Sequence, residues 1–278
     1  MQPKNNISVL LILFVVSICY GQSSTFFNQQ IAKDSIGVIQ IKTDSIFNSN
    51  QIISLLILHN DSSHKFNIKF EHNYLDLKTT SAFAKSKNAL AAINGGFFNM
   101  DSGGSVTYFE ENDTVISRTR NSELKWGITD RLMNGAIVIT NDFKINLQPI
   151  KSEQFYESSK QESAVLVTGP LLLLNSEIMK LPKMKFVNNR HPRTCLCKTK
   201  ESTIFITIDG RRKEAEGMNL IEVQKFLQSI GCIDAINLDG GGSTTMWTQS
   251  KGIVNYPSDA SRERPISNVL LITKKNIH

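Results

Sequence analysis

The sequence predicts an α+β fold: a strand-rich mixed sheet with few helices and one β-α-β crossover over residues 203–238. Short apolar runs separated by turn residues recur along the whole chain, which is typical of strands. The most strongly marked helix stands between two such runs, and this order places the two strands parallel in one sheet. Few other stretches show helical periodicity, so strands should outnumber helices.

Residues 1–21 resemble an export signal. Lys4 supplies the positive start, residues 10–18 form a nearly unbroken apolar run, and residues 19–21 form a small-residue cleavage site. The apolar stretch at residues 7–20 has 14 members, fewer than the ~20 that a membrane-spanning helix needs. We therefore expect an exported protein, periplasmic or secreted, with no membrane span once the signal is removed. Lipid attachment at Cys19 is the alternative.

The composition of the chain is that of an ordinary globular protein, because 40% of its 278 residues are hydrophobic and 20% are charged. Lys and Arg exceed Asp and Glu by six, but these cations are scattered. No run of five or more basic residues indicates a nucleic-acid partner or a membrane surface. Without repeats or linkers, residues 22–87 are interpreted as a strand-rich part of the same domain as the core at residues 88–278.

The cysteines predict no disulfide framework. One of the four lies in the leader, which leaves an odd number: Cys195, Cys197 and Cys232. Cys195 and Cys197 alternate on a predicted strand and therefore face the same side of it. We expect them to be small buried hydrophobic residues rather than a bridge or a metal pair.

Ten apolar runs bounded by turn residues predict strands. In chain order these are residues 37–41, 52–58, 89–93, 106–109, 135–140, 164–168, 194–198, 203–208, 233–238 and 268–273.

The best-defined helix begins after Asn219 and ends at Gly231. Asn219 is a good N-cap, and Glu222 stands at the third helical position, as in a capping box. Gly231 is a typical residue just past a helix end. The apolar residues of the segment share one face; they are Leu220, Val223, Leu227 and Ile230.

Two carboxylates follow the strands that this helix joins. Asp209 comes directly after the strand at 203–208, and Asp239 comes after the strand at 233–238. In a parallel crossover both strands end at the same edge of the sheet, where ligands of α/β units bind. We therefore expect Asp209 and Asp239 to lie near each other.

Three successive glycines, Gly240, Gly241 and Gly242, follow Asp239 and precede Ser243 and Thr244. Without Cβ atoms, their backbone N–H groups can surround an anion or let a sugar ring lie against the chain. The alternative is a simple hairpin turn. The segment is neither a phosphate-binding P-loop, since it lacks Lys-Ser/Thr, nor a nucleophile elbow.

Arginines accompany these loops. Arg211 follows Asp209-Gly210, and a guanidinium there can hold a phosphate through two parallel hydrogen bonds. Arg193 follows His191 and Pro192 at the start of a strand, and Arg264 precedes the last strand. The alternatives are a surface ion pair for Arg211, a polar loop residue for His191 and a solvated charge run around Arg264.

The segment Asn94-Gly95-Gly96 closes the strand at 89–93 and offers an amide for sugar hydroxyls; a tight turn is the alternative. The five histidines form no metal-binding spacing, so we expect no catalytic metal and no cofactor.

Taken together and in this order, the motifs resemble the phosphodiester glycosidase family over residues 88–272, and the stretch from Asn237 to Ser243 is the most specific. The motifs begin at Asn94, Thr168, His191, Asp209, Asn237 and Arg264. Cys195 and Cys197 depart from the small residues expected in the family, and residues 22–87 carry little resemblance.

The resemblance implies an enzyme that hydrolyses the sugar–phosphate linkage of a glycosyl phosphodiester, related to one that removes N-acetylglucosamine. It implies catalytic roles for Asp209, Asp239, Arg193 and Arg211. The substrate-binding residues would be Asn94, Gly95, Gly96, His191, Gly240, Gly241, Gly242, Ser243, Thr244 and Arg264. Two alternatives stay open: a glycan-binding protein without turnover, and a phosphodiesterase that cuts the P–O bond.

Overall fold

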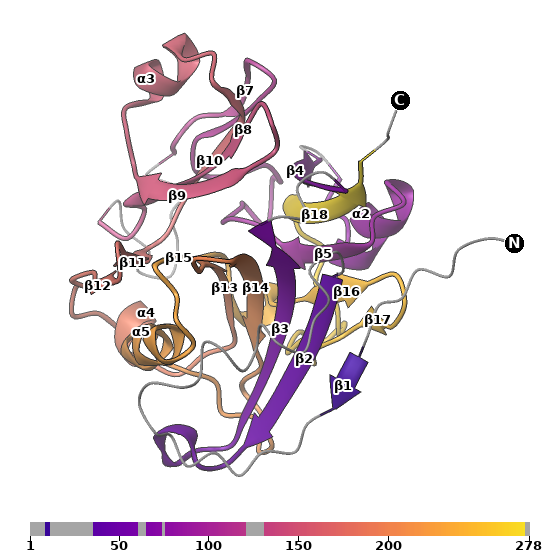
Figure 1. Cartoon of the computed structure of the whole chain (residues 1–278), viewed down its shortest axis with the longest axis vertical. Coiled ribbons are helices and arrows are strands. Elements are labelled where there is room, and N and C mark those ends of the chain that lie inside the picture. Colours follow the sequence, from indigo (N-terminus) through magenta and orange to yellow (C-terminus); the bar gives the residue numbers. More distant parts are fainter. Residues whose placement is uncertain (1–8, 12–35, 61–64, 74–75, 121–130, 276–278) are drawn as a thin grey trace, which may run out of the picture.

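The computed structural model describes residues 9–11, 36–60, 65–73, 76–120 and 131–275 (Figure 1). Within them the chain is rich in strands, mainly antiparallel, and has few helices. This agrees with the predicted strand-rich α+β class. The predicted leader lies outside the described residues except for Val9–Leu11. No helix in the described ranges is both long and apolar enough to cross a membrane.

The largest sheet has eight strands. Its order is β1 (Val9–Leu11), β2 (Ile36–Thr43), β3 (Gln51–His59), β14 (Ser202–Ile208), β13 (Arg193–Lys198), β15 (Asp234–Asn237), β11 (Leu171–Leu174) and β12 (Glu177–Ile178). The ladder between β1 and β2 is parallel, and the others are antiparallel. The N-terminal strands β2 and β3 thus continue the sheet that carries the later motifs.

Two five-stranded sheets complete the molecule. One has the order β17 (Gly252–Ile253), β16 (Met246–Thr248), β5 (Ala91–Asn94), β18 (Asn268–Lys274) and β4 (Phe66–His72). The other has the order β7 (Thr114–Ser117), β6 (Phe109–Glu111), β10 (Glu162–Thr168), β8 (Gly135–Thr140) and β9 (Ile145–Pro149). The α-helices are α2 (Thr80–Ser86), α3 (Glu153–Ser158), α4 (Lys185–Asn188) and α5 (Leu220–Ser229), and short 3₁₀ turns lie at η1 (Ile46–Asn48) and η4 (Gly241–Ser243).

The core is layered, and this explains why the central strands are apolar on both sides. One face of the large sheet, with Leu55 and Ile206, packs against α5. Its other face, with Leu56 and Phe205, packs against the sheet of β5 and β18, where Leu270 lies. Helix α2 covers the far side of that second sheet. Every residue of β3 is therefore buried, and its sequence is mostly apolar, with Ser54 the one polar residue between Gln51 and His59.

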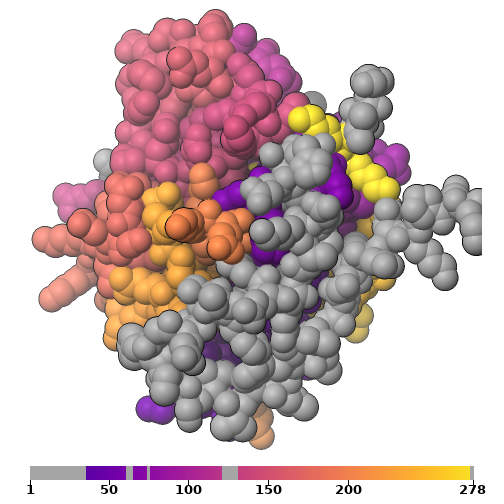
Figure 2. All heavy atoms as spheres, viewed as in Figure 1, coloured from indigo at the N-terminus to yellow at the C-terminus, as the bar shows by residue number. Residues whose placement is uncertain are grey.

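The sheet of β6 to β10 forms one end of the molecule, drawn at the top of Figure 1 with α3 above it. Figure 2 shows this end as one continuous surface in magenta and pink. Its buried residues extend the packing on both faces of the eight-stranded sheet. Val165 belongs to the apolar cluster that contains α5, and Leu166 belongs to the cluster between the eight-stranded sheet and the sheet of β5 and β18.

Helix α5 is confirmed as predicted. Asn219 is its N-cap, and the capping box with Glu222 is complete: Glu222 N–H donates to Asn219 Oδ1 at 2.9 Å, and Asn219 N–H donates to the Glu222 carboxylate at 3.0 Å. Gly231 takes a φ of 82° just beyond the helix. The predicted apolar face is buried.

The predicted crossover is not confirmed in the expected form. Strands β14 and β15 are not hydrogen-bonded neighbours, because β13 lies between them and is antiparallel to both. The two strands still run in the same direction and end at the same edge of the sheet. The sequence order strand–helix–strand does not reveal a third strand that enters between the two.

The expectation of no disulfide is wrong. Cys197 and Cys232 are bridged, with a Cα–Cα distance of 5.8 Å, whereas Cys195 is a free, buried thiol. Burial raises the pKa of Cys195 to about 12. The alternation of Cys195 and Cys197 shows that they share a face. It does not show that the chain beyond α5 brings Cys232 to that face.

Strand boundaries differ where polar residues interrupt apolar runs. The predicted strand at 106–109 begins only at Phe109 in β6, and several strands escaped prediction. Among them, β4 has the sequence Phe-Asn-Ile-Lys-Phe-Glu-His, whose alternation reflects an edge strand with one exposed face.

Candidate active site

All six motifs meet at one edge of the eight-stranded sheet and of the sheet that contains β5 and β18. The motif that begins at Thr168 is held there because Asn237 Nδ2 donates to Gly169 O at 3.0 Å. At this edge β14 and β15 end and β13 begins, while β5 ends and β18 begins. Asp239 N–H donates to Gly95 O at 3.1 Å, and Gly241 N–H donates to Pro192 O at 2.9 Å. The loops that start at Asn94, His191 and Asn237 are therefore held together by backbone hydrogen bonds.

Asp239 lies at the centre of this cluster and is partly exposed. Its Oδ1 accepts a hydrogen bond from Gly240 N–H at 2.9 Å. Burial raises the pKa of Asp239 to about 6, although the Ser243 hydroxyl, Arg264, the Gly240 amide and Arg211 all act to lower it. A carboxyl group with this pKa changes its protonation close to neutral pH, which suits a catalytic acid or base.

Two guanidinium groups lie directly on the glycine loop. A Cβ atom on Gly241 would stand 2.9 Å from Arg211 Nη2, and one on Gly242 would stand 2.3 Å from Arg264 Nη2. Gly241 also has a φ of 60°, in the left-handed region. The glycines thus allow cations to approach the backbone beside Asp239. This close approach was predicted for the loop, but for a ligand rather than for arginines.

Arg264 is oriented by a partner that the sequence did not suggest. Its Nε donates to Asp259 Oδ2 at 2.7 Å. Burial opposes ionisation of Asp259, but hydrogen bonds from Ser261 and Arg264 outweigh it and keep the pKa of Asp259 below its usual value. Asp259 stands in a polar stretch without a recognisable motif, so no sequence signal distinguished it from a surface residue.

Asp209 lies beneath the loop and is fully buried. Its Oδ1 accepts hydrogen bonds from Asn255 Nδ2 at 3.0 Å and from Tyr256 N–H at 3.1 Å. Asn255 Nδ2 also donates to Thr244 O at 3.0 Å. Burial raises the pKa of Asp209 to about 6, against the opposing effects of Asn255, Tyr256, Arg212 and Lys42. Asp209 and Asp239 therefore belong to one cluster, but Asp209 supports the loop from the inside.

Arg193 is also buried, with 1% of its surface exposed. Its Nε donates to Met218 O at 3.0 Å, and its Nη2 donates to Phe186 O at 2.7 Å and to Asn189 O at 3.0 Å. Burial lowers its pKa to about 10, so it stays charged at neutral pH. These contacts hold the backbone of Phe186, Asn189 and Met218 around His191. Arg193 was predicted to be catalytic, but its Nε and Nη2 atoms are engaged by the protein itself.

His191 is partly exposed at the rim of the cluster. Its backbone exchanges two hydrogen bonds with Met218, of 3.3 and 3.2 Å. Burial, followed by the charges of Arg193 and Arg211, lowers the pKa of His191 below its usual value. The imidazole is therefore neutral at pH 7 and can donate one hydrogen bond and accept another.

Asn94 serves the scaffold rather than an open pocket. Its Oδ1 accepts from Thr194 Oγ1 at 2.7 Å and from Thr245 N–H at 3.0 Å, and its Nδ2 donates to Asp239 O at 2.7 Å. Asn268, at the start of β18, similarly holds the backbone of Gly95 and Gly96. Ser243 and Thr244 are buried. Of the predicted binding residues, Gly240, Gly241, His191 and Arg264 remain partly exposed. Arg211, predicted to be catalytic, is exposed.

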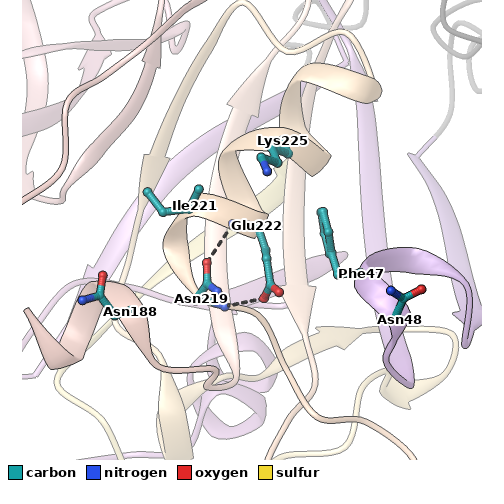
Figure 3. Close-up of a pocket in the computed structure, with 7 residues that line it drawn as sticks. All are labelled: Phe47, Asn48, Asn188, Asn219, Ile221, Glu222 and Lys225. Atoms are coloured by element: carbon teal, nitrogen blue, oxygen red, sulfur yellow. Dashed lines mark hydrogen bonds between the residues drawn. The ribbon is translucent and has the colours of Figure 1, made fainter. Parts of the chain in front are cut away.

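The described residues contain no group of three or more His, Cys, Asp or Glu side chains placed to hold a metal ion. One cavity of about 500 Å³ lies beside the start of α5 (Figure 3), where Asn219 and Glu222 are occupied by the helix cap. A second cavity, of about 560 Å³, lies beside Asp209 and includes Arg212 and Tyr256 in its lining.

The sequence model of the phosphodiester glycosidase family matches residues 87–273. The human N-acetylglucosamine-1-phosphodiester alpha-N-acetylglucosaminidase is 25% identical over 215 residues, which are 70% of this chain and 39% of that protein. The uncharacterized protein YomE from the SPbeta prophage of Bacillus subtilis is 35% identical over 88 residues, 31% of this chain and 13% of its own length.

Two solved structures share the fold. The catalytic domain of the zebrafish N-acetylglucosamine-1-phosphodiester alpha-N-acetylglucosaminidase superposes with a TM-score of 0.67 at 22% identity, covering 88% of this chain and 85% of that one. A hypothetical protein from Synechocystis gives a TM-score of 0.60 at 14% identity, over 86% of this chain and 64% of that one.

Proposed function

The chain belongs to the phosphodiester glycosidase family, and from this premise we propose that it hydrolyses the sugar–phosphate linkage of a glycosyl phosphodiester to a free sugar and a phosphomonoester. The observation that carries the proposal is the position of Asp239. Its titratable carboxyl group lies on a glycine loop against which the guanidinium groups of Arg211 and Arg264 are packed. Groups that can bind an anion thus lie beside a carboxyl group whose pKa is close to neutral pH.

In this reaction the oxygen of a water molecule bonds to the anomeric carbon, and the bond from that carbon to the phosphate oxygen breaks. Asp239 takes the proton from the attacking water. The departing phosphomonoester has a second pKa of about 6, so it leaves near neutral pH without a strong general acid. Stabilisation of its developing charge is the greater requirement.

Arg211 and Arg264 meet that requirement, together with the N–H groups of the glycine loop. Arg211 is exposed on the loop, and Arg264 is held in place by Asp259. Guanidinium groups match the geometry of phosphate oxygens. His191, neutral at the rim, donates a hydrogen bond to a sugar hydroxyl or a phosphate oxygen. Asp209 and Arg193, being buried, position the loops rather than contact the substrate.

The named relatives support N-acetylglucosamine as the sugar, because the human and zebrafish proteins are named for its removal from a phosphodiester. The chain spans 39% of the length of the human relative, so this specificity is proposed for the catalytic core.

We also propose that the protein is exported. The leader-like residues 1–21 support export, and so does the Cys197–Cys232 bridge, since disulfides persist in oxidising compartments.

The test is hydrolysis of an N-acetylglucosamine α-phosphodiester in water enriched in ¹⁸O, with analysis of both products. The label should appear in the free sugar, and Asp239→Asn should reduce kcat by at least ~100-fold. A label in the phosphate would instead identify a phosphodiesterase. Tight binding of the diester without release of sugar would identify a glycan-binding protein.

A further inference from the structure

The cavity beside Asp209 has a basic and partly aromatic lining that the proposed reaction does not use. Its volume is about 560 Å³, within the usual range for small-molecule sites. The lining includes the cations Lys42, Arg212 and Lys213, the ring of Tyr256 and the carboxylate of Glu214. Three cations face one carboxylate, so the cavity favours an anionic ligand.

The charge of the cavity is only partly neutralised by the protein. Arg212 Nε pairs with Glu214 at 3.0 Å. Lys42 and Lys213 form no ion pair within the described part of the chain, although Lys42 acts on Asp209 and Lys213 on Glu214 at longer range. A bound carboxylate or phosphate would supply the missing partner for these two ammonium groups.

Tyr256 adds an apolar surface. About half of the surface of Tyr256 is exposed, and the guanidinium of Arg212 lies 4.5 Å from its ring centroid. This contact holds Arg212 against the ring. The backbone of Tyr256 is fixed by its hydrogen bond to buried Asp209, and Asn50 Nδ2 fixes Lys213 O at 2.9 Å. These hydrogen bonds fix the backbone of two residues in the cavity wall, and a sugar ring can lie beside the ring of Tyr256.

The cavity adjoins the proposed reaction centre. Arg211 lies against Gly241 in the loop beside Asp239, whereas Arg212, the next residue, lines the cavity. A second connection runs from Tyr256 through Asp209 and Asn255 to Thr244. A phosphodiester held by Arg211 would thus extend its second ester group, the aglycone, toward the cavity.

We infer that this cavity is the aglycone subsite and that it selects aglycones that carry both a ring and a negative charge beyond the scissile phosphate, such as a uronate or a sugar phosphate. The inference rests on the proposed function and names the substrate class of that site. Lys42 and Lys213 bind the second charge, and Tyr256 contacts the ring.

Three N-acetylglucosamine α-phosphodiesters test it, with methyl, glucose and glucuronate as aglycones. The variant Lys42→Gln/Lys213→Gln should raise KM for the glucuronate diester about tenfold with kcat unchanged, since the contact binds ground state and transition state alike. KM for the methyl diester should stay the same. Tyr256→Ala should raise KM for both ring-bearing diesters. Lys200→Gln, an exposed lysine at the other end of β14, is the matched control.

Equal KM values for the three diesters, or equal effects of the lysine variant on all of them, would overturn the subsite. Failure of the proposed function looks different, since none of the diesters would release sugar. In that case, calorimetric titration with the uncleaved glucuronate diester still tests whether the cavity binds the aglycone. Weaker binding by the lysine variant supports the subsite, and unchanged binding refutes it.

Discussion

Asp239 and Asp209 end parallel strands and have similarly raised pKa values, yet their surroundings assign them different tasks. Asp239 is partly exposed between two guanidinium groups. Asp209 is sealed in the interior, where its oxygens accept hydrogen bonds from Asn255 and Tyr256. A water or a sugar can reach only the first. In the proposed reaction, Asp239 is therefore the reactive group and Asp209 supports the loop beneath it.

The pKa of Asp239 sets the expected pH profile. A base must be ionised, and burial raises this pKa from 3.8 to about 6, so kcat/KM should rise with pH and level off above a midpoint near 6. In the same window, from 3.8 to about 6, the carboxyl groups of Asp239 and Asp209 bind more protons in the folded protein than in the unfolded chain. Their contribution to the free energy of unfolding should therefore fall as the pH rises.

The measurement is kcat/KM between pH 4 and 9 at constant ionic strength, with unfolding by urea at the same pH values. A profile that falls through pH 6 would mean that Asp239 works in its protonated form, as a general acid. A flat profile would remove it from the chemical step.

Much of this cluster was predictable at the residue scale, because strand-end Asp-Gly pairs and glycine runs are local signals. The roles of Arg193 and Asn94 were not. Whether a polar side chain faces a ligand or the protein depends on carbonyls and amides that arrive from distant segments, such as Met218 O for Arg193 and Thr194 for Asn94. Sequence spacing carries no information about those partners.

At the scale of elements, the glycine loop makes a sharp prediction. Gly242→Ala would place a methyl group 2.3 Å from Arg264 Nη2 and 2.8 Å from Asp259 Oδ2, so this ion pair must move. We expect the variant to fold but to lose at least about tenfold in kcat/KM, the scale of a misplaced charge-stabilising group.

Gly252→Ala is the matched control for this experiment. Gly252 has a φ of 74°, but a Cβ atom there meets nothing within 4 Å. The substitution should therefore cost about 1 kcal/mol of stability through backbone strain and leave kcat/KM unchanged. If both glycine variants retained full activity, Arg264 would not belong to the reaction centre.

Elements with strong local signals were predicted well, as α5 shows with its complete cap and buried face. Strands whose apolar pattern is diluted were missed, including β4 and β9 (Ile-Asn-Leu-Gln-Pro). The pairing of β13 with β15, which places β13 between β14 and β15, joins segments far apart in the chain, and neither hydrophobic periodicity nor capping residues predict it.

At the scale of the whole molecule, Asn94 joins the two large sheets at the site. It belongs to β5 in the five-stranded sheet and accepts a hydrogen bond from Thr194 in β13 of the eight-stranded sheet. Asn94→Ala would leave the Thr194 hydroxyl, the Thr245 amide and the Asp239 carbonyl without this partner. The free energy of unfolding should fall by about 3 kcal/mol, and kcat should fall because Asp239 loses its backbone support.

Urea unfolding and steady-state kinetics measure both effects. Asn146→Ala is the control. It removes an exposed amide that accepts a hydrogen bond from Lys198, and it should change neither the free energy of unfolding nor kcat. A stable but inactive Asn94→Ala protein would assign Asn94 to the substrate instead, as the sequence alone suggested.

The layered core was only partly foreseeable. Continuous apolar strands predict burial on both faces, as found for β3. Which sheet or helix covers each face follows from packing between segments that are far apart in the chain.

The bridge between Cys197 and Cys232 governs how homogeneous material is to be prepared. Synthesis of residues 22–278 in a reducing cytosol yields three thiols, and the pairing of Cys197 with Cys195 or with another molecule then competes with the native pairing. Secretion into an oxidising host compartment, or refolding in a glutathione redox buffer, avoids that competition. A thiol-reactive dye added to the denatured product should then count one reactive sulfur in a chain that begins at residue 22.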